Sequence, residues 1–353
     1  MLNTLQELCT LCGISGDEDA VRDYLIEQIA QCPDILECRT DRLGNLLVHK
    51  QGRERPAQRL MIGAHMDEVG LIVTGIEADG RLSTAPVGGI EPDVVLGRSV
   101  VLPGIGTGVA GSVPVHKLTG EQRDKKPKAS DLLVDIGTGS REASEALVTP
   151  GQSVCYYGPW TPLGGGRVAS KAIDDRFGCA VMLTLLREEL PYDTWFCFFV
   201  QEEISLRGSR AAAFSVDPAL CLILETTTAA DLDGVEGADA VCRLGSGPVV
   251  SFMDRATIYD KALFRLAFET AAALHIPCQT KTRIAGGNDA GAVHITREGV
   301  RTLAVSLPCR YLHSPYTVAD VQDMEHTLTL VRSLIKNVQT GERAHDEADH
   351  QGM

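Results

Sequence analysis

A stretch rich in glycine and proline constrains the fold most, because it interrupts a regular alternation of helical and strand-like segments. Between Gly70 and Gly120, eleven glycines and four prolines occur in 51 residues. Both residue types destabilise helix interiors, so this density excludes long helices and favours a small β-rich unit. Apolar runs of helical and strand-like spacing alternate on either side of it. We therefore predict an α/β fold, a mixed sheet flanked by helices, with an inserted small β-rich domain.

The flanking segments define the expected elements and domain boundaries. Helices are predicted at residues 2–11, 21–29, 176–190, 207–214, 261–275 and 321–338, with Ser15-Gly16-Asp17 capping the second of them. Strands are predicted at residues 45–50, 59–65, 195–203, 220–227 and 302–307. We expect a discontinuous catalytic domain of residues 1–68 and 164–341, an insertion of residues 69–163, and a frayed polar tail of residues 342–353.

Composition narrows the choice of partners and compartment. The 353 residues carry a formal net charge of −14 and a pI of about 5.1, which argues against a nucleic-acid surface. No apolar run is long enough to span a membrane, and the N-terminal segment does not resemble a signal peptide. Most of the eleven cysteines lie within apolar runs, which indicates free thiols and a cytoplasmic protein. Cys9 and Cys12 lack the second pair that a zinc knuckle needs.

Acidic and histidine side chains occur where apolar strands end or helices begin. Ligands collect at the carboxyl ends of strands in open α/β sheets, so these residues are candidates for one common site. Five places along the chain carry them: His65 with Asp67, the pair Asp174 and Asp175, the pair Glu202 and Glu203, Glu225, and His313.

Each of these residues alone has a structural interpretation that competes with the functional one. A histidine at a strand end commonly forms a structural hydrogen bond, Asp174 and Asp175 could cap a helix, and Glu225 could pair with an arginine. Together, five such places point to a metal site. Two histidines with several carboxylates suit Zn, Co or Mn, and they suffice for two ions that share a bridging aspartate. Two ions could activate a water, provided that one free carboxylate acts as the base.

Five motifs resemble those of the glutamyl aminopeptidase, or tetrahedral aminopeptidase (TET), family of dinuclear metallopeptidases. They are GAHMDEVGLIV from residue 63, KAIDDRFGCAVML from residue 171, QEEISLRGS from residue 201, GGNDAGAVH from residue 286 and RYLHSPYTVAD from residue 310. The resemblance covers nearly the whole chain in family order, and it implies the fold of the co-catalytic zinc peptidases. It also implies that the insertion is a dimerisation domain.

The resemblance implies a role for each matching residue. The metal ligands would be His65, Asp174 as the bridge, Glu203, Glu225 and His313, and the Asp174–Asp175 peptide bond would be cis. Glu202 would be the general base and Asp67 the residue that orients His65. Asp289 is a candidate substrate residue, with a turn-forming role as the alternative. Many relatives have aspartate at the position of Glu225, which leaves the chemistry of that metal site open.

The implied function is a metal-dependent aminopeptidase that removes N-terminal residues from short peptides with two divalent ions, Zn, Co or Mn, in each subunit. The implied assembly is a dimer-based homo-oligomer such as a dodecamer. A deacylase acting on N-acylated amino acids is the nearer alternative. A glycosidase is the more distant one, because its mechanism needs two carboxyl groups and has no use for His65 and His313. The preferred N-terminal residue and the native metal stay open.

Overall fold

The computed structural model describes the backbone of residues 1–350 except for residues 114, 118, 124–126, 129, 130 and 285. Its main element is a mixed β-sheet of ten strands. Nine strands follow one another across the sheet: β1 (Ile35–Thr40), β2 (Leu46–Lys50), β14 (Thr194–Phe199), β4 (Leu60–His65), β15 (Leu220–Thr228), β17 (Arg301–Arg310), β18 (Thr317–Asp320), β12 (Arg167–Ser170) and β11 (Thr161–Pro162). The tenth, β16 (Val249–Val250), pairs with β17. The four central strands β14, β4, β15 and β17 are parallel, and the outer pairings are antiparallel.

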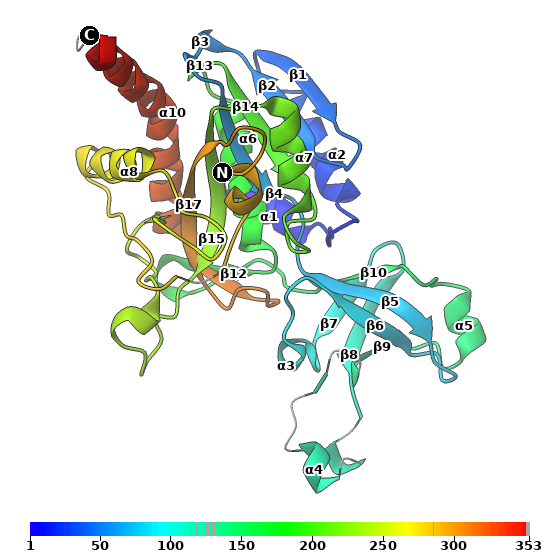
Figure 1. The fold of residues 1–353 in the computed structure, drawn as a ribbon. Helices are drawn as coiled ribbons and strands as arrows, with labels where there is room; N and C mark the ends of the chain where they lie inside the picture. Colours follow the sequence, from blue (N-terminus) through cyan, green and yellow to red (C-terminus); the bar gives the residue numbers. More distant parts are fainter. Residues whose placement is uncertain (114, 118, 124–126, 129–130, 285, 351–353) are drawn as a thin grey trace.

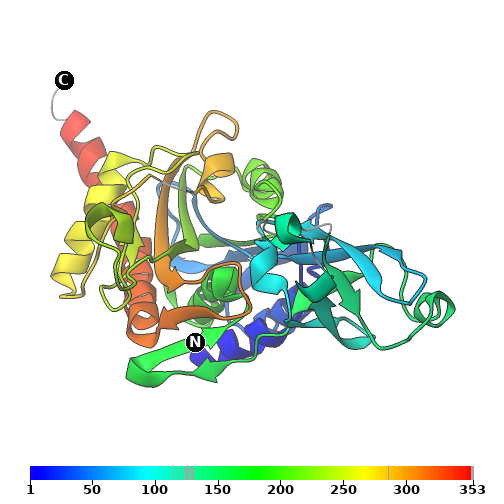
Figure 2. The same ribbon diagram turned by 90° about the horizontal axis from the view of Figure 1, so that it is seen from below.

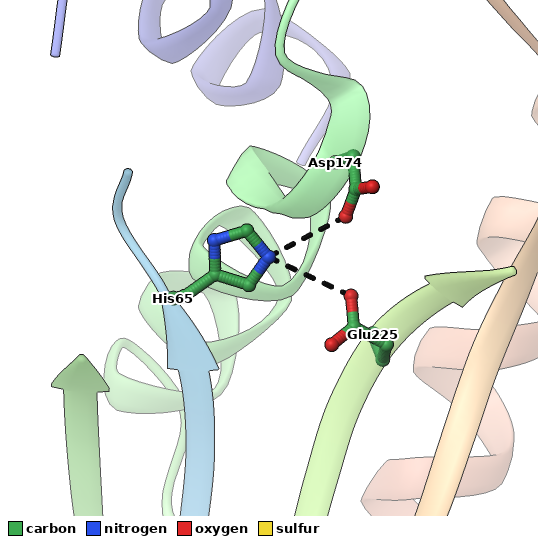
Figure 3. Close-up of side chains that lie close together, drawn as sticks. All are labelled: His65, Asp174 and Glu225. Atoms are coloured by element: carbon green, nitrogen blue, oxygen red, sulfur yellow. Dashed lines mark ion pairs between the residues drawn. The ribbon is translucent and has the colours of Figure 1, made fainter. Parts of the chain in front are cut away.

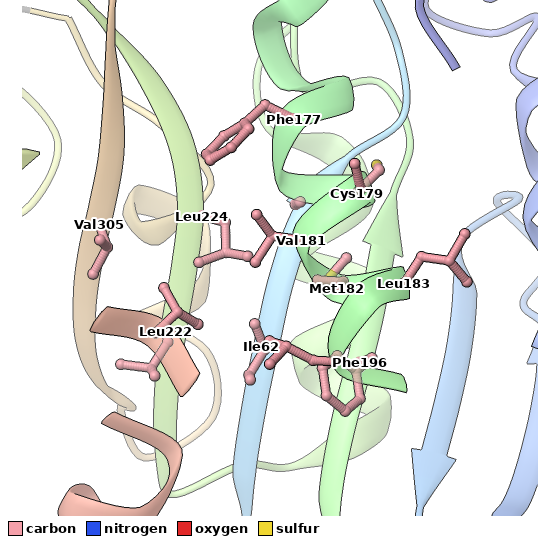
Figure 4. Packing of buried hydrophobic residues seen from close by; sticks show 14 of the residues in the cluster. Ile62, Phe177, Cys179, Val181, Met182, Leu183, Phe196, Leu222, Leu224 and Val305 are labelled. Carbon is pink, nitrogen blue, oxygen red and sulfur yellow. The ribbon is translucent and has the colours of Figure 1, made fainter. Parts of the chain in front are cut away.

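Alternating side chains of the central strands enter two different cores, one on each face of the sheet. Even-numbered residues of β4, β14 and β15 join the larger core. Its helices are α1 (Leu2–Thr10), α2 (Asp19–Ile29), α6 (Ile173–Leu186), α8 (Lys261–Ala273) and α10 (Val321–His350). Odd-numbered residues of the same strands join the smaller core with α7 (Arg207–Val216) and α9 (Ala290–Val293). The result is a sheet between two helical layers, with α6 packed across its centre (Figures 1 and 4).

The glycine-rich segment forms a closed six-stranded barrel beside this sheet (Figures 1 and 2). Its strands are β5 (Gly70–Ile76), β6 (Leu82–Val87), β7 (Ser99–Leu102), β8 (Gly106–Gly111), β9 (Leu133–Asp135) and β10 (Ser153–Tyr156). The barrel has its own buried core, and its described helices are short: α3 (Pro92–Val95), α4 (Gly120–Arg123), α5 (Arg141–Glu145) and a 3₁₀ turn at Val115–Lys117. Apart from these elements, β3 (Gly52–Glu54) pairs with β13 (Leu190–Tyr192), and Gly164–Gly166 and Gly237–Ala240 form 3₁₀ turns.

The predicted fold class, an α/β fold with a β-rich insertion, is confirmed. The boundaries at residues 69 and 163 and the dimerisation role of the barrel stay predictions. The helix predicted at residues 321–338 is longer in the structure, because α10 continues to His350, and the polar tail of residues 342–353 stays a prediction. Glutamate and alanine, both good helix formers, recur in this segment and favour its helical state. Residues 351–353 lie outside the described part of the chain.

Two local expectations also need correction. Helix α2 begins after Glu18, and the Ser15 hydroxyl donates a hydrogen bond to Asp67 rather than capping that helix. Strand β15 extends three residues beyond Glu225, which therefore lies within the strand instead of at its end. The β-branched Thr226, Thr227 and Thr228 favour this continuation, and they pair with residues 307–309 of β17.

Candidate metal centre

The candidate site forms where β4 ends and its neighbour β15 continues past it. His65 is the last residue of β4, and β15 pairs with β4 only as far as Ile223. His65 and Glu225 share the odd-numbered parity of their strands, so the pleat directs both side chains to the same face of the sheet. The alternation that builds the core therefore also brings the first two candidate ligands together.

Asp174 completes a first group of ligand atoms with these two residues (Figure 3). It lies in the first turn of α6, and the Asp174–Asp175 peptide bond is cis, as the resemblance implied. The Nε2 atom of His65 is 3.4 Å from Oδ1 of Asp174 and 3.6 Å from Oε1 of Glu225. Three ligand atoms from three separate elements thus converge on one point.

A second group shares Asp174 with the first. The Nε2 atom of His313 is 3.6 Å from Oδ2 of Asp174 and 3.4 Å from Oε2 of Glu203. His313 follows β17, and its Nδ1 atom lies 2.8 Å from the main-chain oxygen of Gly89 in the inserted segment. Because Oδ1 of Asp174 faces one group and Oδ2 faces the other, this carboxylate is placed as a bridge between two sites.

The spacing and chemistry of both groups fit divalent ions. Ligand atoms about 2.1 Å from a tetrahedral ion lie about 3.4 Å from one another, close to the 3.4–3.6 Å separations in the two groups. The buried Oδ1 atom of Asp174 also has no hydrogen-bond partner among the described residues. A buried carboxylate oxygen without a donor is costly unless a cation offsets its charge. Imidazole nitrogens with carboxylate oxygens suit Zn, Co or Mn.

The electrostatics of the cluster show how closely its charges are coupled. Burial raises the pKa of Glu225, and it raises that of Glu203 to about 8. Although burial opposes the effect, Asp174 and Glu203 raise the pKa of His313 to about 9. The pKa of His65 is likewise raised, against the effect of burial, by Asp174 and the neighbouring carboxylates. The closely spaced carboxylates therefore favour positive charge at this site.

Glu202 lies beside the ligand groups without completing either of the two that share Asp174. One of its carboxylate oxygens lies within 4.8 Å of ligand atoms of His65 and Glu203, and its side chain lines the same cleft. Burial raises the pKa of Glu202 well above the usual value of a glutamate. A carboxyl group of this kind, next to a metal but free of it, can accept a proton from a metal-bound water.

Asp67 holds the turn that presents the two glutamates. Its side chain is fully buried and accepts hydrogen bonds from the Ser15 hydroxyl at 2.6 Å and from the main-chain N–H groups of Glu202 and Glu203 at 3.0 and 3.1 Å. The Nδ1 atom of His65 is 3.1 Å from the main-chain oxygen of Asp67 and 3.4 Å from its carboxylate. Asp67 thus contacts His65, as expected, but its carboxylate chiefly fixes the position of the glutamate pair.

Glu18 is a supporting residue that the sequence did not indicate. Its buried carboxylate accepts hydrogen bonds from the main-chain N–H groups of Gly16 at 2.8 Å and Gln201 at 3.0 Å, which ties the N-terminal loop to the glutamate turn. Burial raises the pKa of Glu18 to about 7. No local pattern marks this residue, because its partner Gln201 is 183 positions away.

A cleft of about 500 Å³ opens over both ligand groups. It is lined by the candidate ligands, by Glu202, by residues 226–228 of β15 and by residues of the loops around Val241 and Gly286. Asn288 lines it, whereas its neighbour Asp289 is buried at the start of α9 and both Asp289 carboxylate oxygens lack a hydrogen-bond partner among the described residues. Asp289 thus lies next to a residue of the cleft wall but is not itself part of the lining. A substrate role for Asp289 stays a prediction.

Comparison with known proteins identifies the family. Residues 44–330 match the model of the M42 glutamyl aminopeptidase family, which covers most of the chain. The chain belongs to that family. Among its relatives, a lysyl aminopeptidase from Pyrococcus furiosus is 33% identical over 336 residues, which are 92% of this chain and 94% of the relative. A glutamyl aminopeptidase from Lactococcus lactis is 32% identical over 356 residues, covering 96% of this chain and 97% of the relative.

Solved structures of TET peptidases share the fold. The TET aminopeptidase of the marine sediment archaeon Thaumarchaeota archaeon SCGC AB-539-E09 superimposes with a TM-score of 0.90, at 32% identity and with 96% of each chain covered. The TET1 peptidase of Pyrococcus horikoshii, described as assembling into a tetrahedron or a large octahedral shell, gives a TM-score of 0.82 at 31% identity, with 95% of this chain and 98% of that chain covered. Within the described residues, no helix combines the length and apolar character needed to cross a bilayer.

Proposed function

We propose that this M42 family member is a metal-dependent aminopeptidase that removes N-terminal residues from short peptides by means of a water activated between two divalent ions. One observation carries the proposal: two groups of ligand atoms share the two oxygens of Asp174. An arrangement with one bridging carboxylate suits a pair of ions a few ångströms apart better than one ion or a structural cluster of cationic histidines.

Each ligand group would hold one ion, which would be Zn, Co or Mn. His65 and Glu225 would hold the first, Glu203 and His313 the second, and Asp174 both. When bound, a pair of such ions lowers the pKa of a shared water and polarises the carbonyl of the scissile peptide bond. The contacts of His313 with Gly89, and of His65 with Asp67, would fix the orientation of both rings.

Glu202 would act as the general base. Its carboxylate lies beside the ligand groups and is not needed as a ligand of either, so it can take a proton from the attacking water and deliver it to the leaving amine. Asp67 supports this step by holding the main chain of Glu202 and Glu203 in one geometry. In this division of labour, Glu203 would be ionised as a metal ligand and Glu202 would exchange a proton.

Assembly and location complete the proposal. The likeness to TET peptidases, one of which forms closed shells, supports a homo-oligomer built from dimers, with a dodecamer as one form. The barrel would provide the dimer contact. We further propose a cytoplasmic location, supported by the eleven cysteines, all free and most of them buried.

The test uses purified protein, chromogenic aminoacyl arylamides, and added Zn, Co or Mn. We expect release of the N-terminal amino acid, abolished by a chelator and restored by metal. Activity that survives complete metal removal would contradict the proposal. Turnover of N-acylated amino acids in place of arylamides would instead identify the deacylase, and turnover of oligosaccharides in chelator would identify the glycosidase.

A further inference from the structure

The wall of the cleft contains a buried cation, Lys281. Apart from the candidate ligands and Glu202, the described lining consists of glycines, threonines, Val241, Leu312, Asn288 and this lysine. No other lysine or arginine and no further acid occurs in that lining. Lys281 is therefore the only charged group that the described wall offers to a substrate in addition to the catalytic cluster.

Lys281 lacks a protein partner that would explain its burial. Only 9% of the residue is exposed, and its ammonium forms no hydrogen bond or ion pair with the described residues. The ammonium nitrogen is not among the fully buried side-chain atoms that lack a partner in the described part of the chain, so solvent in the cleft reaches it. An accessible ammonium without a protein partner can pair with an anionic group that arrives with the substrate.

The main chain around Lys281 is held in place from both sides. The Gln279 side chain donates to the main-chain oxygens of Arg243 at 2.8 Å and Gly247 at 3.0 Å. The Thr282 hydroxyl donates to the main-chain oxygen of Ala238 at 2.7 Å, and its N–H group donates to Val241 at 2.9 Å. These bonds fix the main chain on both sides of Lys281 before a ligand binds, which lowers the entropic cost of recognition.

Family membership alone does not decide which substrate this wall accepts. Relatives of nearly equal similarity carry opposite names, lysyl in Pyrococcus furiosus and glutamyl in Lactococcus lactis. An ammonium in the wall opposes a cationic side chain and attracts an anionic one. The residue at position 281 therefore distinguishes anionic from cationic substrates, which the overall similarity to these relatives does not.

We propose that Lys281 selects the substrate by pairing its ammonium with a carboxylate of the bound peptide. The inference rests on the proposed aminopeptidase function. A peptide can offer this carboxylate from an acidic N-terminal side chain or, in a dipeptide, from its C-terminus. The proposed metal ligands would hold the ions at the scissile bond, so the second charge contact would fix how the rest of the peptide lies in the cleft.

The experiment compares kcat/KM ratios in the metal-loaded wild type and in Lys281→Met, which keeps the length of the side chain. One arm uses Glu and Gln arylamides, and the other uses Leu-Gly and Leu-Gly-amide. We expect the wild type to favour the carboxylate in one arm by about ten-fold or more, and Lys281→Met to lose that preference. The arm in which the preference is lost identifies the source of the carboxylate.

Two further variants separate recognition from general damage. Lys281→Arg should retain part of the preference, whereas Lys261→Met, which replaces an exposed lysine at the start of α8, should keep the wild-type ratios. If Lys281→Met left both ratios unchanged in an active enzyme, the role of Lys281 would be refuted and the aminopeptidase would stand. If the wild type released nothing from any of these substrates, the proposed function itself would fail, and this inference with it.

Discussion

Replacing Asp67 by alanine removes three hydrogen bonds that converge on one buried carboxylate. The Ser15 hydroxyl and the N–H groups of Glu202 and Glu203 would lose their acceptor. Each buried donor left unpaired costs about 1–3 kcal/mol. Because water can enter the space left by the side chain, we expect a total near the lower end, about 3–5 kcal/mol.

For a chain of 353 residues, this loss corresponds to a melting temperature lowered by about 5 °C. The same change frees the turn that carries the proposed base, so kcat should fall by about 10–100-fold. Asp67→Asn offers a matched comparison, because its amide keeps one acceptor oxygen and the shape of the side chain. It should lie between the wild type and the alanine variant in both measurements.

The assay is thermal denaturation at a fixed scan rate, with metal present, followed by kinetics on an aminoacyl arylamide. Asp19→Ala is a suitable control, because Asp19 is an exposed aspartate paired only with Arg22 at the surface, and such pairs contribute little. An Asp67→Ala variant with the melting temperature and kcat of the wild type would refute the reasoning that this carboxylate organises the site.

Two other substitutions test the supporting structure. Lys171→Met should destabilise the protein by about 3 kcal/mol, because the buried Lys171 Nζ lies 2.7 Å from the carboxylate of the buried Glu68. Denaturant unfolding measures this loss, and a change below about 1 kcal/mol would contradict the prediction. Burial raises the folded-state pKa of Glu18 to about 7, from 4.5. Between pH 4.5 and 7, Glu18 therefore holds a proton in the folded state that it has released in the unfolded state. The wild type should therefore lose up to about 3 kcal/mol relative to Glu18→Gln between pH 4.5 and 7, and the opposite trend would contradict the assignment.

Much of the metal cluster was predictable because its residues mark the ends of apolar segments or match family motifs. His65, Asp174, Glu203, Glu225 and His313 were all named from the sequence, and the structure brings them together. The pleat explains part of this success, since strand parity sets the face on which His65 and Glu225 lie. Their metal-binding roles stay predictions.

The supporting residues could not be found in the same way. Ser15 and Glu18 act on residues 52 and 183 positions away, and no periodicity relates such partners. Lys281 lies on an irregular loop, where no periodic pattern of apolar residues indicates which side chains are buried. The helix capping assigned to Ser15 illustrates the limit: the local rule was reasonable, but the tertiary hydrogen bond to Asp67 took precedence.

The central claim is that Glu203 binds metal while its neighbour Glu202 moves the proton. The most direct test is the metal content per subunit, measured with turnover, of Glu202→Gln and Glu203→Gln beside the wild type. We predict that Glu202→Gln retains two ions and loses turnover by at least about 100-fold, whereas Glu203→Gln binds less metal. Equal loss of metal from both variants, or full turnover in Glu202→Gln, would contradict the account.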